Sequence, residues 1–305
     1  MSSTDQRWFH RRGDLARAGW ESVVDATTPG WEHTGIRVAE LGDGGHLDLD
    51  DTGVERIVVP LAGSFHVTHH HFPGEWQTDL HGRASVFSGP TDVLYLPTGT
   101  TAEIRGHGRV AVAEAPTAEV RSWQYIPASD TPVELRGKGA SSRQVHNFGT
   151  PQALDAARLI VCEVITPAEN WSSYPPHKHD EHVPGHESRL EEIYYFETAP
   201  VAGSDAAAEA SFGMFSTYSS PAGDIDINAM VHTGDIALVP YGYHGPAVAA
   251  PGYDLYYLNV MAGPDPDRAW LISDDPAHAW VRASWDDQEL DPRLPFTNET
   301  RKGRR

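Results

Sequence analysis

Short runs of β-branched and aromatic residues, separated by Gly, Pro and Asp, dominate the pattern of this chain. Such runs are typical of strands, and turn residues at regular intervals between them indicate a sandwich or barrel. Helical periodicity is nearly absent, although residues 151–157 could form one or two helical turns. The expected strands of the first half are 35–41, 54–61, 64–68, 92–96 and 109–114. Those of the second half are 159–165, 191–197, 213–218, 235–239 and 253–260. We therefore predict an all-β protein.

Two histidines separated by one residue, His177 and His179, follow Pro175-Pro176 in an extended segment. Side chains two apart on a strand share a face, and the prolines keep a helix from starting there. Glu192 begins a second strand that could return antiparallel to the first, and His244 is the natural third imidazole. This donor set suits zinc, manganese or iron(II), with positions left for water or substrate. We predict that these four residues bind one divalent metal ion.

Other glutamates could replace Glu192 in this set. Glu187 and Glu191 are the alternatives, but strand alternation lets only one of Glu191 and Glu192 face inward. The position before Ile-Tyr-Tyr favours Glu192. Lys178, between the two histidines, is expected to face away from the metal for the same reason.

The two halves share an order of motifs. A carboxylate opens a strand at 55–63 and again at 192–197, and a later hydrophobic strand ends in Pro-x-Gly at 97–99 and at 240–242. This order resembles the two signature motifs of the cupin superfamily, which implies a bicupin, two antiparallel jelly-roll barrels in one chain. The expected division is a metal-free cupin-like domain at 1–140 and a cupin domain with the metal site at 141–305.

The first half also contains a His-x-His followed by Glu, at His69, His71 and Glu75. The intervening Phe-Pro-Gly is typical of a hairpin tip, and the cluster follows the 55–63 strand instead of preceding it. The later segment 97–102 has no histidine for a second motif. We expect a solvated turn at this place, with no metal.

Composition limits the partners and the location. The chain has 305 residues, with 23 Lys and Arg against 43 Asp and Glu, a formal charge of −20. That excess argues against nucleic acid and anionic membranes, which need a basic face. The single cysteine, Cys162, permits no internal disulfide, and no apolar run approaches a signal peptide or a membrane span. A cytoplasmic protein without membrane attachment is expected.

Longer blocks carry a more specific resemblance. They are residues 136–147, 159–167, 170–180 and 251–263, the third reading Asn-Trp-Ser-Ser-Tyr-Pro-Pro-His-Lys-His-Asp. They resemble the 5-deoxy-glucuronate isomerase family of myo-inositol catabolism over nearly the whole chain except the termini. The related uronate ketol-isomerases share the metal pattern but not these blocks. The resemblance implies a metal-dependent aldose–ketose isomerase that converts 5-deoxy-glucuronate to 5-dehydro-2-deoxy-gluconate.

The chain departs from that family at three places. Phe215–Tyr218 stands where the family usually carries Gln-Arg-Val-Tyr, so an arginine is absent, and residues 223–228 and the glycine after His244 also differ. The predicted ligands are intact. An isomerase acting on a different uronate-type sugar acid therefore stays open.

Such a reaction needs a base that removes the proton next to the carbonyl, giving an enediol, while the metal polarises the substrate oxygens. Sequence does not single out the base. The candidates are Tyr194, Tyr218, Tyr243, Glu191 and a metal-bound hydroxide. A sugar-acid substrate also needs a cation for its carboxylate. The hypotheses for it are Arg143, Lys178 and Arg189.

Two other classes of function compete with the isomerase. One is a cupin metal dioxygenase with an open iron site, which oxygen consumption would reveal. The other is a non-catalytic sugar-acid sensor or storage-like bicupin, against which the complete ligand set weighs. Sandwiches with exposed edge strands often pair, so a homodimer is a further hypothesis.

Overall fold

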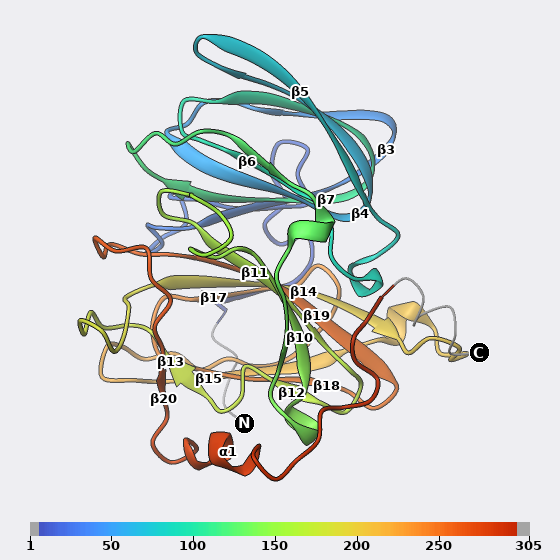
Figure 1. The fold of residues 1–305 in the computed structure, drawn as a ribbon, viewed down its shortest axis with the longest axis vertical. Helices are drawn as coiled ribbons and strands as arrows, with labels where there is room; N and C mark the ends of the chain where they lie inside the picture. The colour runs from blue at the N-terminus through green and yellow to red at the C-terminus, as the bar shows by residue number, and fades with distance from the viewer. Residues whose placement is uncertain (1–5, 298–305) are drawn as a thin grey trace.

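The computed structural model describes residues 6–297 and is built almost entirely of antiparallel strands (Figure 1). The N-terminal sheet has the strand order β2-β3-β7-β4-β6-β8, with β5 paired to β4. Its strands are β2 (Ser22–Val24), β3 (Gly35–Leu49), β4 (Val54–His71), β5 (Gly74–Arg83), β6 (Val93–Leu96), β7 (Thr101–Pro116) and β8 (Gln124–Ile126). The long strands β3, β4 and β7 make most of this half.

Two further sheets form the second half. The first has the order β1 (Phe9–His10), β17 (Ile236–Val239), β14 (Glu191–Pro200), β19 (Tyr253–Ala262), β11 (Ile160–Thr166), β10 (Arg143–Gly149) and β9 (Val133–Arg136). The second has the order β16 (Asn228–Val231), β15 (Gly213–Tyr218), β18 (Tyr243–Ala249), β13 (His177–Lys178) and β20 (Ser273–Asp274), with β12 (Trp171–Ser172) also on β18. The predicted all-β bicupin is confirmed.

Helical structure is short. The helix α1 (Trp280–Ser284) lies below the second half in Figure 1, and the 3₁₀ turns are η1 (Val86–Ser88), η2 (Ala128–Asp130), η3 (Gly139–Ser141) and η4 (Ala208–Ala210). Residues 151–153 form a turn, and the predicted helical turns do not extend through 157. Within residues 6–297 no helix has the length and apolar character needed to cross a bilayer.

The two halves share a hydrophobic core because β4 is buried on both faces. Ile57 and Val59 belong to the large core that continues into the second half, whereas Val58 belongs to the smaller core of the N-terminal half. Successive strand residues point to opposite faces, so a continuous apolar run is what a strand between two layers requires. The first strand, β1, pairs with β17 of the second half. The division at residue 140 stays a prediction.

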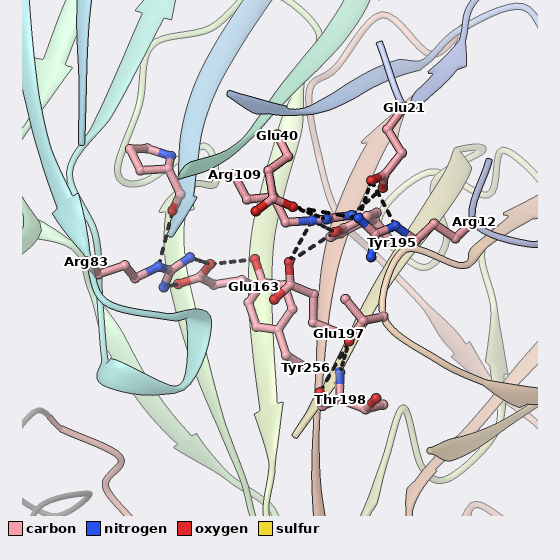
Figure 2. Close-up of polar contacts among 12 residues, drawn as sticks. Arg12, Glu21, Glu40, Arg83, Arg109, Glu163, Tyr195, Glu197, Thr198 and Tyr256 are labelled. Carbon is pink, nitrogen blue, oxygen red and sulfur yellow. Dashed lines mark hydrogen bonds and ion pairs between the residues drawn. The ribbon is translucent and has the colours of Figure 1, made fainter. Parts of the chain in front are cut away.

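Buried charges also join the halves, as Figure 2 shows. Arg83, at the end of β5, donates to both carboxylate oxygens of Glu163 on β11, each at 2.7 Å. Glu163 also accepts from Tyr256 at 2.8 Å and contacts Nδ1 of His146 at 2.5 Å. Both members of the Arg83–Glu163 pair are almost fully buried. The charges are therefore compensated by geometry that only the docked halves provide.

Candidate metal centre and substrate cavity

The candidate metal centre lies between the two sheets of the second half. Glu192 is near the start of β14 in one sheet, while His177 on β13 and His244 on β18 belong to the facing sheet. His177 and His244 are direct cross-strand partners. Their imidazole centroids are 4.6 Å apart. Strand pairing thus brings together residues that are far apart in the sequence.

Three ligand-type side chains converge most closely. One ligand atom from each of His179, Glu192 and His244 lies within 4.8 Å of the others, and all three residues are buried. The Nε2 atoms of His179 and His244 lie 2.9 and 3.1 Å from Oε2 of Glu192. His177 lies beside this group, against the ring of His244, but is not part of the tight cluster.

The histidine tautomers follow from their backbone contacts. Nδ1 of each of the three imidazoles lies within hydrogen-bond distance of a main-chain carbonyl, which can only accept. Nδ1 therefore carries the proton, and Nε2 of a neutral ring presents a lone pair. The carbonyls are those of Pro175 for His177 at 3.2 Å, Leu190 for His179 at 3.1 Å and Gly242 for His244 at 3.1 Å.

Lone pairs that face a carboxylate repel it unless a proton or cation lies between them. Within residues 6–297, Nε2 of His244 is a buried polar atom without a hydrogen-bond partner. Burial would raise the pKa of Glu192, but hydrogen bonds and charge from His179 and His244, which require a proton on the facing Nε2 atoms, lower it to about 2. An ionised carboxylate with imidazole lone pairs around it is the donor set that a divalent ion takes.

A cavity of about 200 Å³ opens beside Glu192 and His177. Its wall combines polar side chains with a few apolar ones. The residues are Arg136, Arg143, Val145, Val164, Ser173, Tyr174, His177, Glu192, Tyr194, Tyr257, Asn259, Trp270, Ile272 and Arg282.

Of the three cations predicted to bind a substrate carboxylate, only Arg143 lines this cavity. Its guanidinium is buried and donates to the carbonyl of Ser141 at 2.9 Å. The guanidinium carbon lies over the ring of Trp285, 5.4 Å from the ring centroid. No carboxylate of residues 6–297 pairs with it. Burial lowers the pKa of Arg143 to about 10, which still leaves the side chain cationic at neutral pH. An unpaired buried cation is what an anionic ligand needs.

The other two cations lie elsewhere. Lys178 faces away from the cavity, and its Nζ donates to Asp180, Glu181 and Glu187 at 2.7, 2.9 and 2.8 Å. Those three carboxylates form a cluster of metal-ligand type, and the Lys178 ammonium lies among them. Arg189 is exposed and lies outside the cavity wall.

The candidates for proton transfer also lie in different places, some in the cavity wall and some outside it. Tyr194 lines the cavity, and its hydroxyl lies 3.1 Å from Oγ of Ser173. Burial raises the pKa of Tyr194 well above its ordinary value, so it is a neutral hydroxyl. Glu191 points the other way and accepts from the backbone N–H of His33 at 2.7 Å and of neighbouring residues in the first half. The structure thus gives Glu191 a contact between the halves.

Tyr218 and Tyr243 stack on each other outside the cavity wall, with ring centroids 5.3 Å apart. The Tyr218 hydroxyl donates to Asp275, on the segment that follows β20. Burial and that carboxylate raise the pKa of Tyr218. Neither hydroxyl reaches the wall formed by Tyr194.

The segment Phe215–Tyr218, in which an arginine of the family is absent, does not line the cavity. Phe215 packs inside the barrel against Tyr194, with centroids 4.6 Å apart. Ser216, the next residue on β15, bonds to Asn228 on the exposed side of the sheet. Alternation along the strand therefore places this departure from the family pattern outside the substrate cavity.

Sequence reasoning missed several residues of the wall, among them Ser173, Tyr257, Asn259, Trp270 and Arg282. One sequence feature could have indicated two of these wall residues. Tyr257 and Asn259 are two apart in an apolar strand, so both face the same side, and an amide there is unusual for a core position. Trp270 and Arg282 come from the C-terminal segment, for which the sequence pattern predicted no element.

The histidines of the first half do not form a comparable site. His71 ends β4, and the predicted hairpin tip follows it. His69 is buried between Trp76 and Trp123, so our expectation of a solvated turn is wrong for this residue. The first half does bring His46, Asp48 and Glu103 together, but on the surface, with Arg105 on both oxygens of Glu103.

The fold and this cluster define a bicupin with a His/Glu centre in its second barrel. The chain matches the model of the KduI/IolB family over residues 9–281. It is 39% identical over 278 residues to 5-deoxy-glucuronate isomerase of Geobacillus thermodenitrificans, covering 90% of this chain and 93% of that protein. The Bacillus subtilis (strain 168) enzyme of the same name is 35% identical over 268 residues, covering 86% and 93%. The chain belongs to the KduI/IolB family and is an isomerase.

Solved structures agree on the fold. An IolB-like protein from Salmonella typhimurium superimposes with a TM-score of 0.79 at 32% identity, covering 90% of this chain and 99% of that one. An oxalate decarboxylase variant from Bacillus subtilis gives a TM-score of 0.58 at 11% identity, covering 97% and 89%. The second likeness supports the bicupin architecture alone.

Proposed function

We propose that this protein is a metal-dependent aldose–ketose isomerase that converts 5-deoxy-glucuronate to 5-dehydro-2-deoxy-gluconate. The observation that carries the proposal is the convergence of imidazole Nε2 atoms on Glu192 beside a cavity with an unpaired arginine. We infer the substrate from the relatives that are named 5-deoxy-glucuronate isomerase.

His179, Glu192 and His244 would hold the ion, and His177 would take a fourth position. A bound divalent ion would supply Lewis acidity to the carbonyl and hydroxyl oxygens of the substrate. Arg143 would bind the carboxylate at a distance from the reacting carbons and fix the orientation of the chain. Tyr194, as a neutral hydroxyl in the wall, would donate to a substrate oxygen.

The direct test is to incubate metal-loaded protein with 5-deoxy-glucuronate in deuterated water and follow it by NMR. Loss of the aldehyde signal with formation of the 2-deoxy-5-keto acid would support the reaction, and deuterium at the new C–H would support an enediol. No turnover by fully loaded protein would contradict the proposal. Oxygen consumption in its place, with iron bound, would favour the dioxygenase.

Replacing Arg143 tests the carboxylate site. We expect Arg143→Gln to raise KM for the sugar acid by about 30-fold or more, with a smaller change in kcat, because removing one member of a desolvated charge pair costs about 2 kcal/mol or more. Steady-state kinetics would measure both constants. Arg189→Gln is the matched control, because Arg189 is exposed and outside the cavity. A rise in KM for Arg189→Gln alone would transfer the role to that residue.

A further inference from the structure

Asn259 is a buried amide in the cavity wall whose role is not explained by the metal centre. It lies on β19, paired with Tyr194 of β14 on one side and with Cys162 of β11 on the other. Only 3% of its surface is exposed. Within the described residues, its Nδ2 has no hydrogen-bond partner, although the residue lines the same cavity as Glu192 and Arg143.

Cys162 lies beside this amide on the neighbouring strand. The thiol lies 4.0 Å from Oδ1 of Asn259, at the distance of a weak S–H···O contact. Burial raises the pKa of Cys162, so the sulfur keeps its proton and acts as the donor. Oδ1 is the amide atom that faces the thiol, so the two N–H donors of Nδ2 lie on the other side.

A buried N–H group without a partner costs about 1–3 kcal/mol, so the position is expected to receive an acceptor from a ligand. Among residues 6–297, the same wall contains a second buried N–H donor without a hydrogen-bond partner, the indole Nε1 of Trp270. Arg143 adds a cation without a carboxylate. The wall thus offers one site for an anion and two separate donors for neutral oxygens.

We propose that Asn259 binds a hydroxyl or carbonyl oxygen of the substrate and makes the cavity selective for polyhydroxylated carboxylic acids over apolar acids of the same length. This inference rests on the proposed function for the anionic end of the ligand. Arg143 would hold the carboxylate, and Asn259, with Trp270 as the second donor, would recognise oxygens along the carbon chain. Asn259 is then a specificity-determining residue.

Equilibrium binding separates this inference from the isomerase proposal. Zinc-loaded protein is titrated by calorimetry with D-gluconate and with hexanoate, a six-carbon acid without hydroxyls. We expect the unaltered protein to prefer D-gluconate, and Asn259→Leu to weaken D-gluconate by about tenfold or more while leaving hexanoate unchanged. Asn259→Ala, which removes the donors without adding a charge, serves if the leucine variant does not fold. Arg143→Gln should weaken both acids.

Asn228→Leu is the matched control, because Asn228 is an exposed amide on β16 outside the cavity wall. It should bind D-gluconate like the unaltered protein. Equal weakening of both acids by Asn259→Leu, no weakening of either, or no preference for D-gluconate in the unaltered protein would overturn the inference. Absence of turnover with 5-deoxy-glucuronate would contradict the isomerase proposal and leave this binding test intact.

Discussion

Protein carrying His244→Ala is expected to lose its divalent metal ion and at least about 10³-fold of its turnover, since Lewis-acid stabilisation of the transition state amounts to several kcal/mol. Nε2 of His244 has no partner within residues 6–297 except the carboxylate that it faces. Removing it breaks the cluster of three and leaves His179 and Glu192, with His177 beside them, as an incomplete ligand set. Metal content by mass spectrometry and turnover by NMR would be measured on the same preparation.

Glu192→Gln should give the same loss with little change in shape, because an amide replaces the carboxylate. His186→Ala is the control, since His186 is an exposed histidine nearby in the sequence and outside the cluster. It should retain one ion per chain. Dialysis against a chelator should abolish turnover of the unaltered protein, and the ion that restores it would identify the metal. Full metal content in His244→Ala would contradict the assigned site.

The largest effect on stability is expected for Arg83→Met. This change leaves the Glu163 carboxylate buried without its guanidinium, which typically costs about 3–5 kcal/mol. The free energy of unfolding from urea denaturation would measure it. Arg105→Met is the matched control, because Arg105 pairs with Glu103 in the same half but in solvent, where such pairs contribute little. Equal destabilisation by both changes would show that the buried pair contributes no more to stability than the exposed pair.

The same pair makes stability depend on pH. Burial would raise the pKa of Glu163, but the charge of Arg83 and the hydrogen bond with His146 lower it to about 2. A carboxyl with a depressed folded pKa contributes its full stability above its ordinary value and loses it as the pH falls through the folded pKa. The difference between Arg83→Met and the unaltered protein should therefore be largest near pH 7 and shrink below about pH 4.5. A difference that grows with acidity would contradict this account.

Local patterns predicted much of the fold. Runs of β-branched residues with turn residues between them predicted most strands, since alternation and turn chemistry act over a few residues. The predicted strand at 54–61 lies within β4, and the predicted strand at 191–197 within β14. The predicted strand at 64–68 is the continuation of β4. The break expected at Ala62-Gly63 is part of one long strand, whose pairing with β7 shifts register between Pro60 and Ala62.

The sequence also predicted the candidate metal ligands, from the His-x-His spacing and from the motif order that supplied Glu192 and His244. The structure places His179, Glu192 and His244 in one cluster and His177 beside it. The cation for the substrate was not. Arg143, Lys178 and Arg189 were equivalent hypotheses, and a charged side chain does not itself indicate whether its partner is a carboxylate of the protein or a ligand. The structure separates them, because Lys178 has three carboxylates and Arg143 has none.

The sequence by itself determined an all-β bicupin, its family and a set of candidate metal ligands in its second half, because these depend on local alternation and on motifs of a few residues. Only the tertiary structure decided which polar groups remain unpaired in the cavity, and which ones join the halves. Glu163 meets Arg83 from 80 positions away, and Asn259 lies beside Cys162 from 97 positions away. Contacts of that separation depend on how the sheets stack, and burial then determines whether a charge or an amide is a structural partner or a binding site.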